Sequence, residues 1–194
     1  MRLLERENTR MEELNLRYEK TGQKIGEDYD TDYYGNVIAA VVTLKDIRSM
    51  NALLGAITTG GMATRTLAEF APSSLDPVLA KLQHADPLVR ISALHVLEGI
   101  LEPPNYDKVK DPVYRSKIKQ AIIRATSDQN PVVRGAAAWA LSSLGDTDVI
   151  PLLERTARED PAFLAHQAEG GKDLYFVRLN AQRALARIKR KQVH

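Results

Sequence analysis

A motif that recurs every 44 residues constrains the fold of this chain more than any other feature of its sequence. The first copy reads D-P-L-V-R-I-S-A-L from Asp86, and the second reads N-P-V-V-R-G-A-A-A from Asn130. A shorter third copy, F-V-R-L-N-A, begins at Phe176. The three copies align through Arg90, Arg134 and Arg178. Self-similarity at a period of about 20–50 residues is typical of stacked repeat architectures.

Each copy has the apolar periodicity of an amphipathic helix. A valine begins the helix, an alanine follows one turn later, and a larger aliphatic residue follows at each of the next two turns. In the second copy these residues are Val133, Ala137, Leu141 and Leu144. This spacing places one apolar stripe along the helix, and the small alanine lets a neighbouring helix approach closely.

A second amphipathic segment separates successive copies. After Leu144 the sequence G-D-T-D-V-I-P-L-L-E-R-T-A-R-E-D supplies a glycine stop, an aspartate start and a proline in the first turn of the next helix. A more divergent unit of the same plan surrounds Arg65, and residues 35–57 predict a first hairpin. We therefore interpret each V-R helix as the first helix of a repeat and the segment after it as the second.

The N-terminal segment stands apart from the repeats. Apolar residues recur there every seven positions, at Leu4, Met11, Tyr18 and Ile25. Glu7 and Thr21 occupy the other seam positions, which disfavours a coiled coil and favours a cap over the first hairpin. The sequence thus predicts an amphipathic capping helix over residues 1–27 and a repeat domain over residues 28–194.

Over residues 33–190 the chain resembles the HEAT-like repeats of the subtype named after phycobilisome lyases. The signature of that subtype is V-R-x-x-A-x-x-A-L-x-x-L-G-D followed by I-P-x-L, and its best copy runs from Val133 to Leu153. The resemblance implies an all-α, armadillo-like, right-handed α-α superhelix of about four to five helical hairpins. It also implies a structural role for the repeat arginines, which we expect to form a ladder that ties adjacent repeats. The ladder consists of Arg65, Arg90, Arg134 and Arg178, with Asp86, Asn130 and Asp173 as turn partners.

Composition and motifs argue against several function classes. The formal charge is only +2, from 27 basic and 25 acidic side chains, and this disfavours nucleic acid as a partner. Cysteine is absent, no His-rich metal motif occurs, and no serine stands in a nucleophile elbow. No apolar run is long enough to predict a membrane span. We therefore predict no catalytic residue, no metal and no cofactor, and interpret the chain as a non-enzyme.

The expected function is a protein-binding scaffold or adaptor that uses a concave face and inserted loops. We expect the second helices to line that face and the insertions at residues 102–111 and 161–175 to border it. The alternative for each insertion is a solvated connection or one extra helical turn. The predicted contact residues are Lys81, Lys117, Lys119, Glu154, Arg155 and Arg158 on the helices and Tyr106, His166 and Tyr175 in the insertions.

Two alternative functions and several general properties stay open at this stage. The name of the resembling subtype suggests a phycobilin lyase or a chromophore or protein chaperone. A solenoid that binds nucleic acid is the other alternative, although Trp139 is interpreted as core packing rather than as a base-stacking platform. A protein or peptide partner, a monomer or weak dimer, and a cytoplasmic location are favoured, with export after signal removal as the alternative location.

Overall fold

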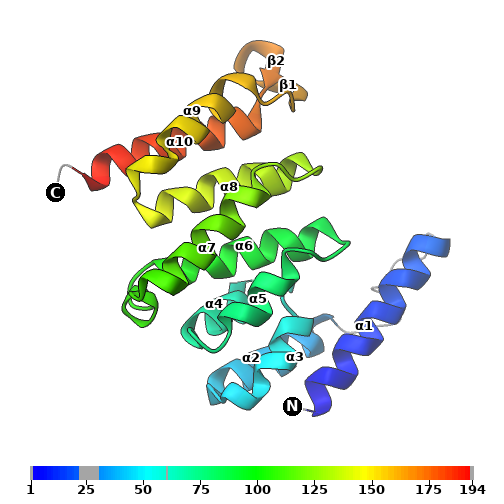
Figure 1. Cartoon of the computed structure of the whole chain (residues 1–194). Coiled ribbons are helices and arrows are strands. Elements are labelled where there is room, and N and C mark those ends of the chain that lie inside the picture. The colour runs from blue at the N-terminus through cyan, green and yellow to red at the C-terminus, as the bar shows by residue number, and fades with distance from the viewer. Residues whose placement is uncertain (1, 22–30, 60, 193–194) are drawn as a thin grey trace.

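The computed structural model describes residues 2–21, 31–59 and 61–192, which form a stack of α-helices with one small β-hairpin (Figure 1). The helices are α1 (Arg2–Thr21), α2 (Thr31–Leu44), α3 (Met50–Gly55), α4 (Gly61–Glu69), α5 (Leu75–Lys81), α6 (Pro87–Leu101), α7 (Pro112–Ala125), α8 (Pro131–Leu144), α9 (Ile150–Glu159) and α10 (Phe176–Lys191). Short 3-10 helices at Ile47–Ser49, Tyr106–Val109 and Thr147–Val149 precede α3, α7 and α9. The predicted all-α solenoid is confirmed, while its handedness stays a prediction.

The same cap begins three of the repeat helices. Asp86, Asp111 and Asn130 each accept a hydrogen bond of 2.8 Å from the backbone N–H two residues later, and a proline follows each of them. The side-chain oxygen satisfies one of the free N–H groups of the first turn, and the proline has no N–H that would need a partner. Gly145, with φ 72°, ends α8 in the left-handed conformation that favours glycine. This cap and the proline after it thus define where α6, α7 and α8 begin.

The helices form two layers. α4, α6, α8 and α10 pack on one another in chain order and form one layer, while α5, α7 and α9 form the other (Figure 1). Leu94, Leu97 and Leu141 of the first layer and Ile118 and Ile122 of the second are fully buried. The apolar stripes read from the sequence therefore face the interior of the stack.

The pairing of helices into hairpins differs from the sequence interpretation. α5 packs on α6, α7 on α8 and α9 on α10, so each V-R helix pairs with the helix that precedes it. With α3 and α4, which also pack on each other, the described residues contain four such hairpins, in line with the expected four to five. Periodicity alone does not distinguish the two pairings, because every helix of the stack buries a single stripe. The interpretation of each V-R helix as the first of its hairpin is wrong.

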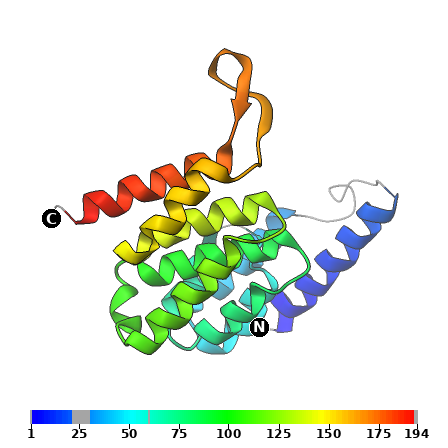
Figure 2. The ribbon, with the colours of Figure 1, turned by 45° about the horizontal axis from the view of Figure 1, so that its top comes forward.

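The insertion at residues 161–175 forms a β-hairpin, with a short 3-10 turn at Glu169–Gly171 between its strands. Leu164–Ala168 (β1) pairs antiparallel with Lys172–Leu174 (β2), and this hairpin projects from the junction of α9 and α10 (Figure 2). Gly170 and Gly171, both with φ 72°, form the turn between the strands. Glycine adopts this positive φ without steric cost. The turn between the strands therefore depends on these two glycines.

Helix α1 packs on α2 and α3 at one end of the stack. Leu4 is fully buried, and the buried Asn8 Nδ2 donates a hydrogen bond of 2.8 Å to the carbonyl oxygen of Ala52. Tyr34 Oη donates to Asn8 Oδ1 at 2.5 Å. A Cβ at Gly55 would lie 2.5 Å from Asn8 Nδ2, so this close approach needs glycine. The predicted boundary between residues 27 and 28 lies outside the described residues and stays a prediction, as does Ile25, the last position of the heptad pattern.

Candidate functional site

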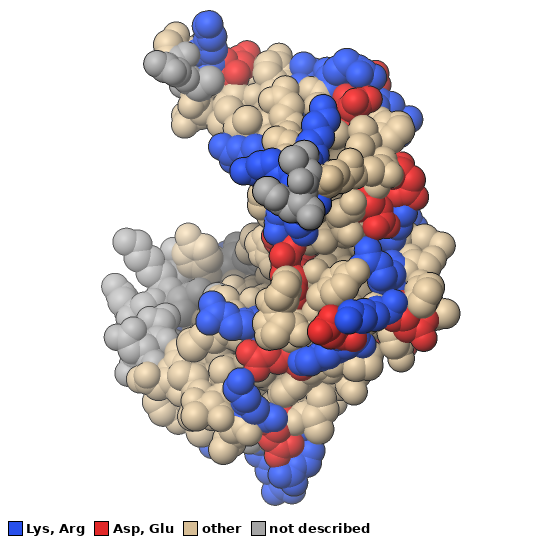
Figure 3. All heavy atoms as spheres, turned by 90° about the vertical axis from the view of Figure 1, so that its left-hand side faces the viewer, with Lys and Arg blue, Asp and Glu red and all other residues tan. Residues whose placement is uncertain are grey.

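One side of the molecule is hollowed, as the C-shaped outline in Figure 3 shows. Figure 1 is seen from the side of α5, α7 and α9, so this hollowed side belongs to the other layer. Three hollows of about 290–440 Å³ lie along it, lined mainly by α4, α6, α8 and α10. We call the exposed surface of these four helices the inner face, and the layer of α5, α7 and α9 the outer layer. The expectation that the helices after the V-R helices line the concave surface is therefore wrong.

A hollow of about 410 Å³ lies at the centre of the inner face, between α6, α8 and α10. Its lining residues are Ile91, His95, Val132, Ala136, Trp139, Asn180 and Arg183. We call it the tryptophan hollow. None of these lining residues is acidic, and four of them are apolar. Its size and its apolar lining suit the side chain of a ligand or partner.

Two further hollows adjoin the tryptophan hollow at His95. One, of about 440 Å³, lies between α4 and α6 beside the Pro103–Pro104 turn, and the other, of about 290 Å³, is bordered by Leu88. Leu88 and Val132 occupy equivalent positions in α6 and α8 and are 61% and 51% exposed. Large aliphatic side chains in solvent on a hollowed face are typical of a surface that a partner covers.

A network of hydrogen bonds and charges fixes the indole of Trp139. Its Nε1 donates to Glu98 Oε1 of α6 at 2.8 Å, and the Arg187 guanidinium of α10 lies 5.1 Å from the ring centroid. Arg187 also donates to Glu102 Oε1 at 2.6 Å, and Lys191 lies 3.3 Å from the same oxygen. Three helices thus hold the aromatic ring in one orientation, and Trp139 is a half-buried wall of a hollow rather than core packing.

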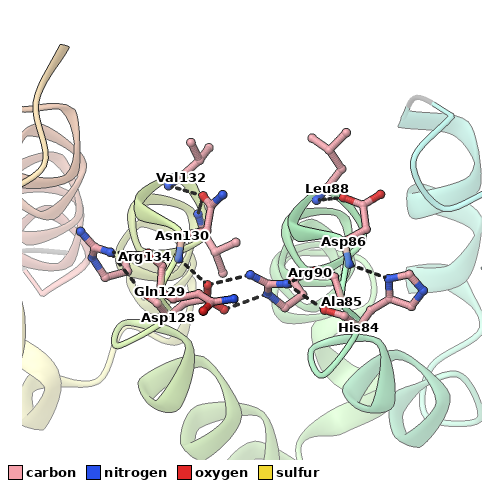
Figure 4. Close-up of polar contacts among 11 residues, drawn as sticks. His84, Ala85, Asp86, Leu88, Arg90, Asp128, Gln129, Asn130, Val132 and Arg134 are labelled. Carbon is pink, nitrogen blue, oxygen red and sulfur yellow. Dashed lines mark hydrogen bonds and ion pairs between the residues drawn. The ribbon is translucent and has the colours of Figure 1, made fainter. Parts of the chain in front are cut away.

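The repeat arginines connect the ends of neighbouring helices (Figure 4). Arg90 Nη1 donates to the carbonyl oxygens of His84 and Ala85, both at 2.8 Å, before its own helix. Its Nε and Nη2 donate to the two carboxylate oxygens of Asp128, both at 2.8 Å, in the turn before α8. The Arg90 and Asp128 side chains are only 7% and 14% exposed. A bidentate ion pair shielded in this way fixes the position of one repeat on the next.

Arg134 repeats this arrangement one unit later. Its Nη1 donates to the carbonyl oxygen of Asp128 at 3.0 Å, and its Nε and Nη2 donate to Asp160 at 2.7 and 3.1 Å. Asp86 and Asn130, which the sequence offered as the partners, instead cap their own helices. The carboxylate that binds each arginine comes from the following turn. The predicted turn partners were thus wrong for Arg90 and Arg134.

Arg178 and Arg65 differ from the other two arginines. Arg178 Nε donates to the carbonyl oxygen of Asp160 at 2.7 Å, and its guanidinium lies 4.3 Å from the ring centroid of Tyr175. Arg65 is exposed, borders the hollow between α4 and α6, and makes no hydrogen bond or ion pair with the part of the chain that the structure describes. Arg178 therefore joins the ladder through a backbone oxygen, and the expected inclusion of Arg65 is wrong.

The ladder changes the pKa values of the two carboxyl groups that it contains. Burial alone would raise the pKa values of Asp128 and Asp160, but the hydrogen bonds from Arg90 and Arg134, and those from backbone N–H groups, lower both below the ordinary value of 3.8. Because the folded state holds these carboxyls ionised, the unfolded state binds more protons in acid. The stabilisation is present in full above about pH 4 and is lost as the pH falls through the lowered pKa values.

We accordingly expect the free energy of unfolding to decrease as the pH is lowered from about 4. Thermal melts between about pH 2 and pH 7 measure this dependence, and an Asp128→Asn, Asp160→Asn double variant serves as the comparison. The variant lacks both carboxyls, so its stability is lower at neutral pH and changes less in acid. Identical pH profiles of the two proteins would contradict the assignment.

The predicted contact residues of the second helices lie on the outer layer or at its end, and some already have partners. Lys117 Nζ lies 3.3 Å from Asp76 Oδ1, and Lys119 Nζ lies 2.9 Å from Asp146 Oδ2 and 2.6 Å from Asp148 Oδ1. These pairs connect α7 to neighbouring repeats. Glu154, Arg155 and Arg158 are exposed on α9, and Lys81 borders a groove of about 320 Å³ beside α1. None of these residues faces the tryptophan hollow.

Tyr106 and Tyr175, two of the predicted loop residues, also lie away from the tryptophan hollow. Tyr106 is half-buried, and its ring centroid lies 5.1 Å from the guanidinium of Arg115. Tyr175, 37% exposed, has its ring centroid 5.5 Å from that of Phe163 at the base of the β-hairpin. His166 belongs to β1, but the placement of its side chain lies outside the described part of the chain. The structure therefore does not bring the predicted contact residues together in one site.

Residues that sequence reasoning did not select form the centre of the inner face. His95, Trp139 and Arg183 stand 44 residues apart and line one hollow. The sequence signal was that the residue type at this one repeat position differs in every copy, whereas the valine and alanine positions of the apolar stripe keep their residue type. Such variation within a repeat is expected at the surface that a repeat protein uses for recognition.

Within residues 2–21, 31–59 and 61–192, no group of three or more His, Asp or Glu side chains lies together as a metal site requires. None of the helices described there is long and apolar enough to cross a membrane.

Comparison with known proteins agrees with the repeat architecture. Residues 108–171, which contain the helices α7, α8 and α9, match the family model described as HEAT repeats. No curated protein matches the chain, and no solved structure does. The matched segment contains the Arg134 repeat, whose plan recurs 44 residues earlier around Arg90. Residues 108–171 are thus similar to HEAT repeats, and the 44-residue plan extends the same repeat architecture beyond them.

Proposed function

We propose that this protein is a non-catalytic scaffold whose inner face binds a segment of another protein. The observation that carries the proposal is the row of three hollows along α4, α6, α8 and α10, bordered by the exposed side chains of Leu88 and Val132. Exposed apolar patches on a hollowed surface are typical of interaction sites. In a stack, each repeat contacts mainly its neighbours, so one side of every repeat contributes to a continuous exposed face.

The proposal of a non-catalytic role is supported by the chemistry of the same face. His95 borders all three hollows, and no hydrogen bond joins it to a hydroxyl group within the described residues. A general base and its nucleophile lie within hydrogen-bond reach of each other, directly or through one water. The acidic side chains beside the tryptophan hollow, Glu98 and Glu102, already bind Trp139, Arg187 and Lys191. The face therefore offers surfaces for recognition rather than groups for bond cleavage.

A test compares apolar residues that occupy the same local position on the two layers. Leu88 and Val132 follow a cap residue and a proline at the starts of α6 and α8, and Val113, 60% exposed, does so at the start of α7 on the outer layer. We expect a Leu88→Glu, Val132→Glu variant to lose at least about tenfold in capture of partner proteins, because two carboxylates would have to be desolvated. Affinity capture followed by quantitative mass spectrometry measures the loss.

The matched control is Val113→Glu, which adds the same charge at an equivalent backbone position of the outer layer. It should leave capture unchanged, as should reversal of the exposed charges Arg155 and Arg158 on α9. Loss of capture only in the Arg155→Glu, Arg158→Glu variant would assign binding to the outer layer and refute the proposal.

A further inference from the structure

The charges around the tryptophan hollow differ in whether they have partners. Glu98 and Glu102 lie beside Arg187, at 3.5 and 2.6 Å, and Lys191 adds a second cation to Glu102. These charges compensate one another within the protein. Arg183, one turn before Arg187 on α10, is exposed and makes no hydrogen bond or ion pair with residues 2–21, 31–59 or 61–192. The cation that lines the hollow is therefore available to a ligand.

The apolar part of the hollow is held ready for an occupant. The Trp139 indole is fixed by its hydrogen bond to Glu98 and by the guanidinium of Arg187, so little side-chain freedom would be lost on binding. Ile91, Val132 and Ala136 extend the apolar lining beside the ring. A rigid aromatic wall next to aliphatic side chains suits one bulky apolar side chain.

From these two features we infer that the tryptophan hollow recognises an acidic peptide segment in which a bulky apolar side chain stands close to an aspartate or glutamate. The apolar side chain occupies the hollow against Trp139, and the carboxylate binds the Arg183 guanidinium. Arginine presents paired N–H donors that match the geometry of a carboxylate. No acidic residue lines the hollow to repel such a ligand, whereas a basic segment would meet Arg183 directly. This assignment rests on the proposed function and adds the chemistry of the partner.

The same charges argue against nucleic acid as the occupant. Each phosphate bound by Lys or Arg releases counterions, so affinity for nucleic acid depends on how many phosphates the basic side chains contact. On the inner face, Arg187 and Lys191 are already paired with glutamates, which leaves Arg183 and Arg65 as the exposed arginines that border its hollows. Two arginines and one fixed tryptophan suit a carboxylate and a nearby apolar side chain, not a phosphate backbone.

The experiment begins with a phage library of random 12-residue peptides selected on the full chain. We expect enriched peptides to place Asp or Glu within about four residues of Leu, Ile, Met or Phe. A Trp-free synthetic copy of the best peptide is then titrated by calorimetry and by fluorescence, since Trp139 is the only tryptophan of the chain and reports occupancy of the hollow directly. Binding should change the tryptophan emission.

The decisive step reverses the charge first on the protein, at Arg183, and then on the peptide. Arg183→Glu should weaken binding of the acidic peptide at least about tenfold, while Arg158→Glu on the outer layer should change it less than about twofold. A peptide with Lys in place of its acidic residues should recover binding to the Arg183→Glu variant. Circular dichroism and thermal melts verify that each variant folds.

The alternative outcomes separate this inference from the proposed function. Neutral or basic peptides that change the Trp139 emission and ignore Arg183→Glu would overturn the ligand class but retain the inner face as a binding surface. Peptides that bind without changing the emission and tolerate the Leu88→Glu, Val132→Glu variant would overturn both, as would the absence of any enriched peptide. Tighter binding of a single-stranded oligonucleotide, abolished by Arg183→Glu, would replace the peptide by nucleic acid.

Discussion

Replacing Asp128 by alanine is expected to lower the free energy of unfolding by about 3–5 kcal/mol, the usual cost of leaving a shielded charge without its partner. Arg90, whose side chain is 7% exposed, would keep the carbonyl oxygens of His84 and Ala85 but lose both carboxylate oxygens. The backbone N–H of Asn130, which donates to Asp128 Oδ1 at 2.8 Å, would lose its acceptor as well. For a chain of this size the midpoint of thermal unfolding should fall by about 10 °C. Denaturant titration and calorimetry measure both quantities.

Asp76→Ala is the matched control for this experiment. Asp76 also forms an ion pair with the next repeat, at 3.3 Å from Lys117 Nζ, but the two side chains are 74% and 48% exposed. An exposed pair of this kind contributes less than about 1 kcal/mol. Equal effects of the two substitutions would mean that shielding adds nothing to the ladder, contrary to the prediction.

The fold could be predicted because the 44-residue equivalence is a local property repeated along the chain. Val133, Ala137 and Leu141 predicted a buried stripe, and all three are buried. The assignment of the concave layer failed because both layers of the stack bury one stripe each. Which layer lies inside depends on how whole repeats curve around one another, and no single repeat contains that information.

The predicted contact residues failed for a related reason. Lys117 and Lys119 are cations of amphipathic helices in the sequence, yet their carboxylate partners stand 41, 27 and 29 residues away along the chain. The ladder shows the same limitation, because Arg90 and Asp128 are 38 residues apart whereas Arg134 and Asp160 are 26 apart. Because the sequence separation between partners differs from pair to pair, the repeat period does not predict which residues form an ion pair.

The inner-face residues could have been found from the sequence by comparing the same position in each repeat. They were instead interpreted by residue type alone. Trp139 was interpreted as core packing, although it occupies the same repeat position as His95 and Arg183. The β-hairpin was missed because strands of five and three residues are too short for alternation to stand out from an irregular connection.

Replacing Leu141 by alanine tests whether the molecule behaves as a stack rather than as one globule. Leu141 is fully buried in α8, and removal of such a side chain costs about 2–5 kcal/mol. In a stack, stability is a sum of repeat terms and neighbour terms, so the loss should concentrate in the adjoining repeats. We expect faster amide hydrogen exchange in α7–α10 and nearly unchanged exchange in α2–α4, measured by mass spectrometry under native conditions.

Leu53→Ala provides the mirror experiment at the other end of the stack. Leu53 is equally buried in α3, so the same atoms are removed from a comparable environment. Its effect should concentrate in α1–α4 and spare α8–α10, because α3 packs on α1 and α4 and has no extensive contact with the C-terminal helices. Two variants with opposite exchange patterns would establish neighbour-to-neighbour coupling. Uniform acceleration along the whole chain in both variants would instead require a single cooperative core, and the inner face would then be one surface of a globule rather than the side of a stack.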